Sequence, residues 1–104
     1  MATGIPSRFR LLGHTITVRV VPRPKWRHGR DCVGIWEPDK LRISLLADPI
    51  ETQLQAGFTH ELVHALLDMM NHELSHDEAF VDNLGALLQQ ALTTFEFDKQ
   101  RRGE

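Results

Sequence analysis

Two histidines and a glutamate near the middle of the chain have the residue types and the spacing of a metal site. Residues 60–64 read His-Glu-Leu-Val-His, the H-E-x-x-H pattern, which needs a helix beneath it. Residues four apart lie one above the other on a helix face, so the rings of His60 and His64 can converge on one zinc ion. Glu61 can take a proton from a zinc-activated water as that water attacks a carbonyl. The spacing therefore predicts metal-assisted hydrolysis, with Glu61 as the general base.

The surroundings of this segment argue against a chance match. Leu62 and Val63 separate the histidines, and Phe58 and Leu66 flank them. Two histidines and a glutamate among apolar residues would be costly to desolvate without a partner. The alternative is that the histidines lie on the surface of an amphipathic helix, where so short a pattern can occur by chance. We expect zinc binding.

A third zinc ligand has to come from elsewhere in the chain. A catalytic zinc usually has three protein ligands and one open position. Cys32 is the only cysteine, which excludes both an internal disulfide and a site built from several cysteines. Residues 72–78 read His-Glu-Leu-Ser-His-Asp-Glu and offer several candidates. Histidines and carboxylates must therefore complete the site.

At this point the chain resembles a minimal zincin metallopeptidase of the gluzincin type. Residues 77–82, Asp-Glu-Ala-Phe-Val-Asp, are similar to the glutamate-helix motif of that group, Asn-Glu-x-x-Ser-Asp in thermolysin-like members, and depart from it at Asp77 and Val81. The resemblance implies that Glu78 is the third zinc ligand. It also implies that Asp82 orients one of the liganding histidines.

Two other metallopeptidase families bear on the third ligand. SprT-like enzymes use a His in a segment His-Gly-x-x-Phe, and His76 with Phe80 keeps that spacing while Asp77 replaces the glycine. Small ImmA/IrrE-like enzymes use a Glu at the start of the second helix followed by a Glu-Ala-x-x pattern, which Glu78-Ala79 resembles. Glu78 is the expected ligand, and His76 is the alternative.

The group that would stabilise the oxyanion is less evident. The chain has no Tyr, and loss of such a donor typically costs ~10²–10³ in rate. His72, His28, an arginine, or whichever of His76 and Glu78 does not bind metal would have to serve, or the metal alone. His72 is our first candidate for this role.

Resemblance to the zincins implies two further features around the site. In zincins the strand before the active-site helix lies along the cleft and binds extended substrate by strand addition. Residues 33–36 or 41–45 could do so here, unless both are interior strands. Compact gluzincins sometimes keep a terminal segment over the cleft as an inhibitor, and Glu96 or Asp98 could reach the zinc in that way.

The sheet that must support the site is predicted in the first half of the chain. Ile16, Val18 and Val20 alternate with polar residues, and Pro22 and Pro24 follow them. Two further alternating segments, 33–35 and 41–45, flank a turn-like segment at 37–40. We expect about three strands within residues 9–46, with a loop over residues 23–31.

Two helices are predicted in the second half. Asp48, Pro49 and Glu51 are start signals for a helix over about residues 49–70. Ser75 with Glu78 resembles a capping box for a second helix over about 76–95. The apolar stripe expected on this helix comprises Phe80, Leu84, Leu87, Leu88, Ala91 and Phe95. The predicted fold is α+β: a small sheet packed on the active-site helix, a second helix, and a frayed tail over 96–104.

Length and composition are those of one ordinary globular domain. The chain has 104 residues, of which 41% are apolar and 25% charged, so we treat residues 1–104 as a single domain. No apolar run reaches the ~18 residues of a membrane span, and residues 1–10 lack the apolar core of a signal peptide. We therefore expect a cytoplasmic protein with no membrane partner.

Charge is distributed unevenly along the chain. Residues 1–47 contain nine Lys or Arg and three Asp or Glu, whereas residues 48–104 contain three and eleven. The favoured interpretation is that the two halves pack against each other, and the alternative is an anionic partner. Residues 23–30 combine four cations with Trp26, a composition that can contact phosphates and stack on bases but is more often a solvated turn.

The sequence thus predicts a zinc-dependent metallopeptidase that acts on a peptide or protein substrate of unknown specificity. The alternative is a non-catalytic module in which zinc stabilises the fold. Such a module would bind a protein or nucleic acid through the basic loop or an exposed strand.

Overall fold

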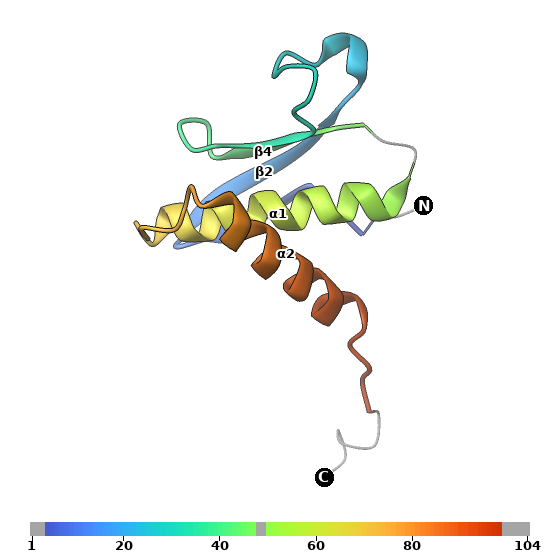
Figure 1. Cartoon of the computed structure of the whole chain (residues 1–104), viewed down its shortest axis with the longest axis vertical. Helices are drawn as coiled ribbons and strands as arrows, with labels where there is room; N and C mark the ends of the chain where they lie inside the picture. The colour runs from blue at the N-terminus through green and yellow to red at the C-terminus, as the bar shows by residue number, and fades with distance from the viewer. Residues whose placement is uncertain (1–3, 48–49, 99–104) are drawn as a thin grey trace.

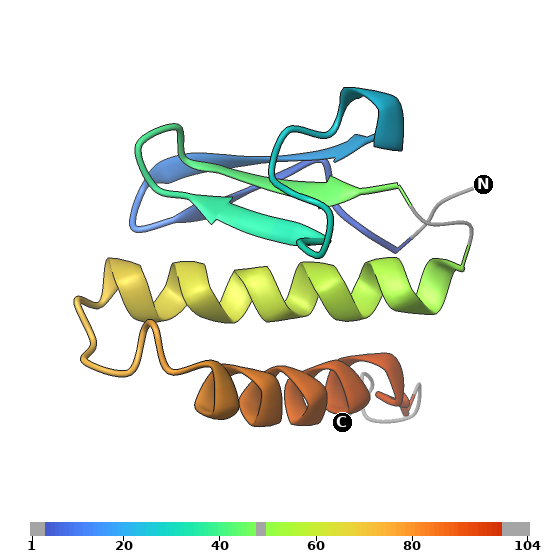
Figure 2. The ribbon, with the colours of Figure 1, turned by 45° about the horizontal axis from the view of Figure 1, so that its top comes forward.

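The computed structural model describes residues 4–47 and 50–98. A four-stranded mixed sheet carries one long helix, α1 (Glu51–Met69), along one of its faces, and a second helix, α2 (Glu78–Thr93), packs against α1 (Figure 1). Turning the molecule shows α1 lying between the sheet and α2 (Figure 2). The predicted α+β fold is confirmed, with one more strand than expected.

The additional strand is β1, Arg8–Leu11, which forms an antiparallel hairpin with β2, His14–Val21. Leu12 and Gly13 connect the two strands with φ values of 50° and 80°. Two successive residues of positive φ match the two-residue turn whose twist suits a hairpin. Residues 8–11, Arg-Phe-Arg-Leu, alternate polar and apolar positions, a short strand signal that the prediction of about three strands did not include.

The order of the strands leaves β3 at an edge of the sheet. β3 is Gly34–Glu37 and β4 is Arg42–Leu46, and the order is β1-β2-β4-β3. β4 pairs in parallel with β2 and antiparallel with β3, so it lies in the interior. Of the two segments proposed for strand addition, 41–45 is excluded because it overlaps the interior strand β4, and 33–36 overlaps the edge strand β3.

Helix α1, Glu51–Met69, covers the face of the sheet on which Ile16, Ile43 and Leu45 are buried. It is slightly shorter than the predicted span of 49–70. Ile50 holds the N-cap position and makes no side-chain cap. The expected start signals Asp48 and Pro49 lie outside the described residues.

The start of α2, Glu78–Thr93, differs from the prediction. Asp77, rather than Ser75, is the N-cap, and its Oδ1 accepts a hydrogen bond from the backbone N–H of Phe80 at 3.0 Å. Satisfying a free N–H of the first turn is what fixes a helix start. The carbonyl of Ser75 lies instead against His64.

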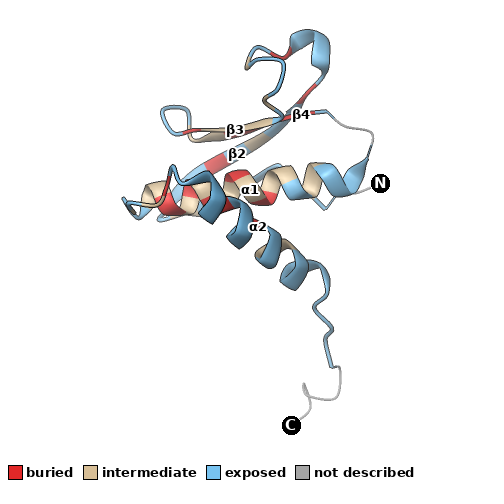
Figure 3. Ribbon diagram, viewed as in Figure 1, coloured by how far each residue is buried: buried red, intermediate tan, exposed pale blue. Residues whose placement is uncertain are grey.

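The face of α2 that packs on α1 shares Leu88 with the predicted stripe but otherwise differs from it. Val81 and Gly85 are buried and Leu88 is half-buried, whereas Phe80, Leu84 and Leu87 of the predicted stripe are exposed. Most of α2 is exposed, as Figure 3 shows. A Cβ on Gly85 would lie 3.5 Å from the Cα of His60. A methyl group would just fit at this position, so a small residue here permits the close approach of the two helix backbones.

A second apolar cluster lies on the opposite face of the sheet. The loop after β2 begins with a short 3-10 helix, η1 (Arg23–Lys25), and packs Trp26 on Val21 and Leu46. The indole N–H of Trp26 donates to the carbonyl of Gly29 at 3.1 Å. Trp26 is buried, so the idea that it stacks on nucleic-acid bases is wrong.

No helix in residues 4–47 and 50–98 combines the length and the apolarity that crossing a bilayer requires.

Candidate metal centre

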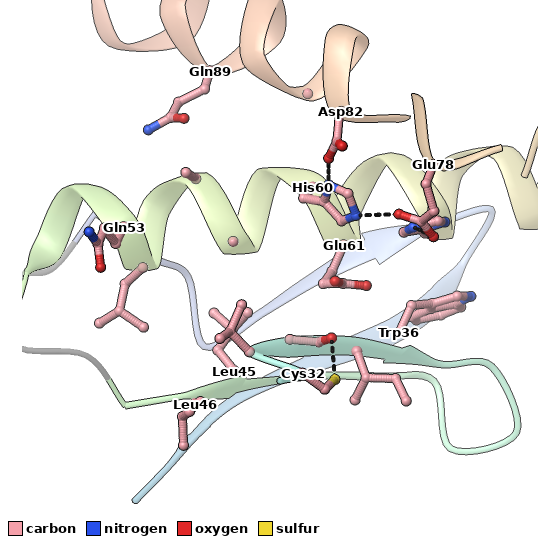
Figure 4. A pocket seen from close by; sticks show the side chains of 18 of the residues that line it. Cys32, Trp36, Leu45, Leu46, Gln53, His60, Glu61, Glu78, Asp82 and Gln89 are labelled. Carbon is pink, nitrogen blue, oxygen red and sulfur yellow. Dashed lines mark hydrogen bonds and ion pairs between the residues drawn. The ribbon is translucent and has the colours of Figure 1, made fainter. Parts of the chain in front are cut away.

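Three predicted ligands converge where α1 and α2 cross. Nε2 of His60 lies 3.1 Å from Oε1 of Glu78 (Figure 4). Nε2 of His64 lies 3.2 Å from Oε2 of the same carboxylate. One ligand atom from each of the three residues lies within 4.8 Å of the others. Zinc bonds of ~2.0–2.1 Å in a tetrahedron place ligand atoms roughly 3.3 Å apart. The donor set and its spacing therefore fit one zinc ion.

The two helices position these ligands in different ways. His60 and His64 occupy successive turns of one face of α1, and their ring centroids are 4.9 Å apart. Glu78 is the first residue of α2, directly after the cap at Asp77. The close crossing at Gly85 brings this end of α2 over the histidines. The position of the Glu78 carboxylate thus depends on tertiary packing, whereas the spacing of the two histidines depends only on helical geometry.

The second ring nitrogen of each histidine has an acceptor. Nδ1 of His60 lies 2.9 Å from Oδ1 of Asp82, and Nδ1 of His64 lies 2.7 Å from the carbonyl oxygen of Ser75. A carbonyl oxygen can only accept, so Nδ1 of His64 carries the proton, and the Asp82 carboxylate favours the same tautomer of His60. With the proton on Nδ1, each of the two histidines keeps a lone pair on Nε2, the nitrogen that lies next to Glu78, as metal ligation requires.

Glu61 lies beside this cluster but faces the sheet. Its side chain is 8% exposed, and this burial raises the pKa of its carboxyl group, opposed by the neighbouring His60 and His64. The backbone N–H of Trp36 also hydrogen-bonds to the carboxylate. A Cβ on Gly34 would lie 3.2 Å from Cγ of Glu61. Strand β3 therefore both holds the carboxylate and leaves room for it.

An open cleft of about 890 Å³ contains these groups. Strand β3, α1 and α2 form its sides. Its apolar lining comes mainly from the sheet side and includes Cys32, Ile35, Leu45 and Leu46. Both polar and apolar parts of an extended chain could therefore be accommodated next to the cluster.

The structure separates the remaining predicted residues into those inside and those outside the cleft. His76 lines the cleft but is not a member of the three-residue cluster. His72 does not line the cleft, and its Nδ1 accepts a hydrogen bond from the backbone N–H of Leu74 at 3.0 Å. His28 packs edge-to-face on Trp26 beyond the other face of the sheet. Among the described residues, neither Glu96 nor Asp98 lines the cleft.

Two residues of the cleft were missed or misjudged from the sequence. The indole N–H of Trp36 donates to Oδ2 of Asp68 at 3.0 Å, and both residues line the cleft. No role is predicted for Asp68 from the sequence. The available signal was its position four residues after His64, which places it on the same helix face. Its partner on the edge strand could not be predicted without the strand order.

Comparisons with known protein families, with curated proteins and with solved structures found no match to this chain. The chemistry of the site is therefore argued from its own residues.

Proposed function

We propose that this protein is a zinc-dependent metallopeptidase. The proposal depends above all on one observation: the Nε2 atoms of His60 and His64 meet both oxygens of Glu78, while each Nδ1 has an acceptor. A buried carboxylate beside the cluster and an open cleft along an edge strand are the further elements that peptide hydrolysis needs.

Zinc is the metal that this donor set suits best. Two imidazole nitrogens and one carboxylate oxygen, with a fourth position open, form a common catalytic zinc site. A site for calcium or magnesium would be built mainly from oxygen ligands. When bound, zinc supplies Lewis acidity and makes water a competent nucleophile near neutral pH.

The edge strand offers a way to bind an extended substrate. β3 pairs with β4 on one side only, and its residues line the cleft that contains the cluster. A peptide that adds to this edge would gain main-chain hydrogen bonds and place its side chains alternately. One of its carbonyl groups would then face the histidines.

Glu61 is positioned to move the proton that hydrolysis requires. In the proposed reaction a water oxygen forms a bond to the peptide carbonyl carbon, and Glu61 accepts the proton that this water loses. The bond from carbon to nitrogen then breaks, and Glu61 delivers the proton to the departing amine. The products are a carboxylic acid and an amine, and Glu61 returns to its ionised form. The hydrogen bond from Trp36 holds the carboxylate in place.

His76 replaces His72 as the proposed oxyanion donor. It lines the cleft and is not a member of the ligand cluster, whereas His72 lies outside the cleft and bonds to its own loop. A donor of this kind is worth ~10²–10³ in rate.

The variant Glu61→Gln tests the proposal because it removes the base and keeps the shape. Zinc content should stay at the wild-type level, while cleavage of an unfolded, fluorescently labelled protein should fall by about 10²–10⁴-fold. Glu73→Gln is the matched control, since Glu73 is exposed in the loop between the helices and does not line the cleft.

Two results would contradict the proposal. One is a Glu61→Gln protein that cleaves as fast as the wild type. The other is a zinc-loaded wild type that cleaves no unfolded protein yet unfolds on chelation, which would favour the non-catalytic zinc module.

A further inference from the structure

The basic and acidic parts of the sequence lie in different layers of the fold. All nine Lys and Arg residues of the first part belong to the sheet and its loops, whereas α2 and the described residues beside it contain no Lys or Arg. The ion pairs that Lys and Arg form among the described residues all go to Glu37, itself in the sheet. The two halves of the chain do pack against each other through α1 and the sheet, as expected, but the described Lys and Arg residues form no ion pair with the acidic half.

The arginines of the sheet lie on the face turned away from the helices. Strand pairing places Arg8, Thr17, Arg42 and Glu37 in one row across all four strands. The neighbouring rows on this face contain Arg10 with Thr15, and Arg19 with Ser44. Ile16 and Ile43, which alternate with them, point to α1 instead. This surface, called here the outer sheet face, is the upper side of the sheet in Figure 2.

Several of these cations have no partner in the described structure. The side chains of Arg8 and Arg10 are exposed and make no ion pair or hydrogen bond with any described residue. The same holds for Arg23 and Arg30 in the loop at the end of the face. Such arginines are free to bind an external anion without first breaking a contact within the protein.

Two cations of the face are held firmly. Arg42 donates from Nε and Nη2 to both oxygens of Glu37, at 3.1 and 3.0 Å. Arg19 donates to Oγ of Ser44 at 2.9 Å, and that hydroxyl donates to Glu37 at 2.6 Å. Rows on one strand face repeat every ~6.6–6.8 Å and strands lie ~4.8 Å apart, so the arginines form a grid with spacings of ~7–10 Å.

We infer that the outer sheet face binds the phosphate backbone of double-stranded nucleic acid. Arginine, which matches phosphate with its planar fork, supplies seven of the nine cations in this part of the chain. The rows of the face expose arginine and threonine, and Ile35, the apolar residue in the Arg19 row, is packed under the Trp26 loop.

A protein partner fits this surface less well. Protein interfaces are centred on apolar and aromatic anchors, which the face lacks. The acidic helices lie on the other side of the sheet, so they do not oppose a bound polyanion closely. The metal cleft opens between β3, α1 and α2 and would stay accessible. The inference goes beyond the proposed peptidase activity and does not depend on it.

The test is fluorescence anisotropy with a labelled 20-base-pair DNA duplex of mixed sequence and the zinc-loaded full chain. About four phosphate contacts predict that the dissociation constant rises about 100-fold between 50 and 200 mM salt. Arg8→Gln/Arg10→Gln should lower the slope of log K against log salt by about 2 and weaken binding at least about tenfold at 100 mM salt.

The matched control changes the net charge equally but on the other layer. Asn83→Asp/Gln90→Glu alters two exposed positions of α2 and should bind the duplex within about twofold of the wild type. If the arginine double variant does not fold, which circular dichroism will show, Arg23→Gln/Arg30→Gln on the loop tests the same face.

Three outcomes would overturn the inference. The first is that the wild type does not bind the duplex at 50 mM salt. The second is that the control variant loses as much affinity as the arginine variants. The third is salt-sensitive self-association of the wild type in sedimentation, abolished by Arg8→Gln/Arg10→Gln, because a second copy's acidic layer would then be the partner.

Discussion

Asp82→Ala removes the carboxylate that accepts from Nδ1 of His60, and zinc affinity should fall as a result. Asp82 Oδ1 lies 2.9 Å from that nitrogen. Without the acceptor, the imidazole can rotate or adopt the tautomer that places its proton on the metal-binding nitrogen. The ligand residues themselves remain unchanged.

The size of the loss follows from the surroundings of Asp82. Removing such an orienting group typically costs 10- to 100-fold in metal affinity. Asp82 is 67% exposed, so water can replace part of its interaction. His64 keeps its own acceptor, the carbonyl of Ser75, which the substitution does not touch. We therefore expect a loss near the lower limit, about tenfold, equivalent to about 1.4 kcal/mol.

Competition with a chromophoric chelator measures this loss directly. Asp82→Asn should fall between the wild type and Asp82→Ala, because an amide oxygen still accepts from Nδ1 but lacks the charge. Asn83→Ala, one residue further along the same helix and exposed, should leave zinc affinity unchanged. Thermal unfolding of the zinc-free proteins should show that neither variant alters the fold.

The reasoning is refuted if Asp82→Ala binds zinc within twofold of the wild type. It is equally refuted if Asn83→Ala loses as much affinity, because the effect would then come from the helix rather than from the hydrogen bond to His60.

Two further predictions concern the framework around the site. Arg42 and Ser44 hydrogen-bond to Glu37, which is 8% exposed, and lower the pKa of its carboxyl group from 4.5 to about 2. Because the pKa in the folded state lies below that in the unfolded state, the ionised carboxylate stabilises the fold by at most about 3 kcal/mol. This stabilisation is present above pH ~5 and is lost as the pH falls toward 2. Urea unfolding should thus show Glu37→Gln much less stable than the wild type at pH 7 and nearly equal to it at pH 2, and a constant difference across pH would contradict this. At the helix crossing, Gly85→Ala should be tolerated, since its Cβ would meet His60 at an ordinary contact distance of 3.5 Å. Gly85→Leu should cost about 1–3 kcal/mol by overpacking and weaken zinc binding by moving Glu78, and equal unfolding curves for the two variants would argue against this crossing.

The parts of the site that were predictable from the sequence are those that local geometry fixes. The spacing of His60 and His64 needs only a helix to bring the rings together. Placing Glu78 and Asp82 depended on resemblance to a known motif, because their approach to the histidines requires the close helix crossing at Gly85. That approach is a tertiary event which helical periodicity does not encode.

The predictions that were wrong for α2 also failed because tertiary contacts decided the outcome. The apolar residues of α2 fill a wide arc, and periodicity could not show that α1 covers the arc around Val81 and leaves Leu87 67% exposed. Ser75 and Asp77 are both good caps, and the loop after α1 decided between them. The position of β3 at the sheet edge likewise followed from the parallel pairing of β2 with β4, which no local pattern shows.

The unneutralised charges add a further lesson about composition. The imbalance between the two parts of the chain was evident from the sequence, but its meaning depended on which faces the charged residues occupy. The fold directs the arginines outward on one side of the sheet and places the acids on the helices of the other side. The basic residues could have formed ion pairs with the acidic half of the chain, but they form a cationic surface on the sheet instead.

The most direct test of the metal centre is the zinc content of the purified full chain, measured together with that of Glu78→Ala and His76→Ala. The account predicts one tightly bound zinc ion per chain in the wild type, the same in His76→Ala, and a large loss of zinc affinity in Glu78→Ala. A wild type that binds no stoichiometric zinc, or a His76→Ala variant that loses zinc while Glu78→Ala retains it, would contradict the assignment of His60, His64 and Glu78 as the ligands.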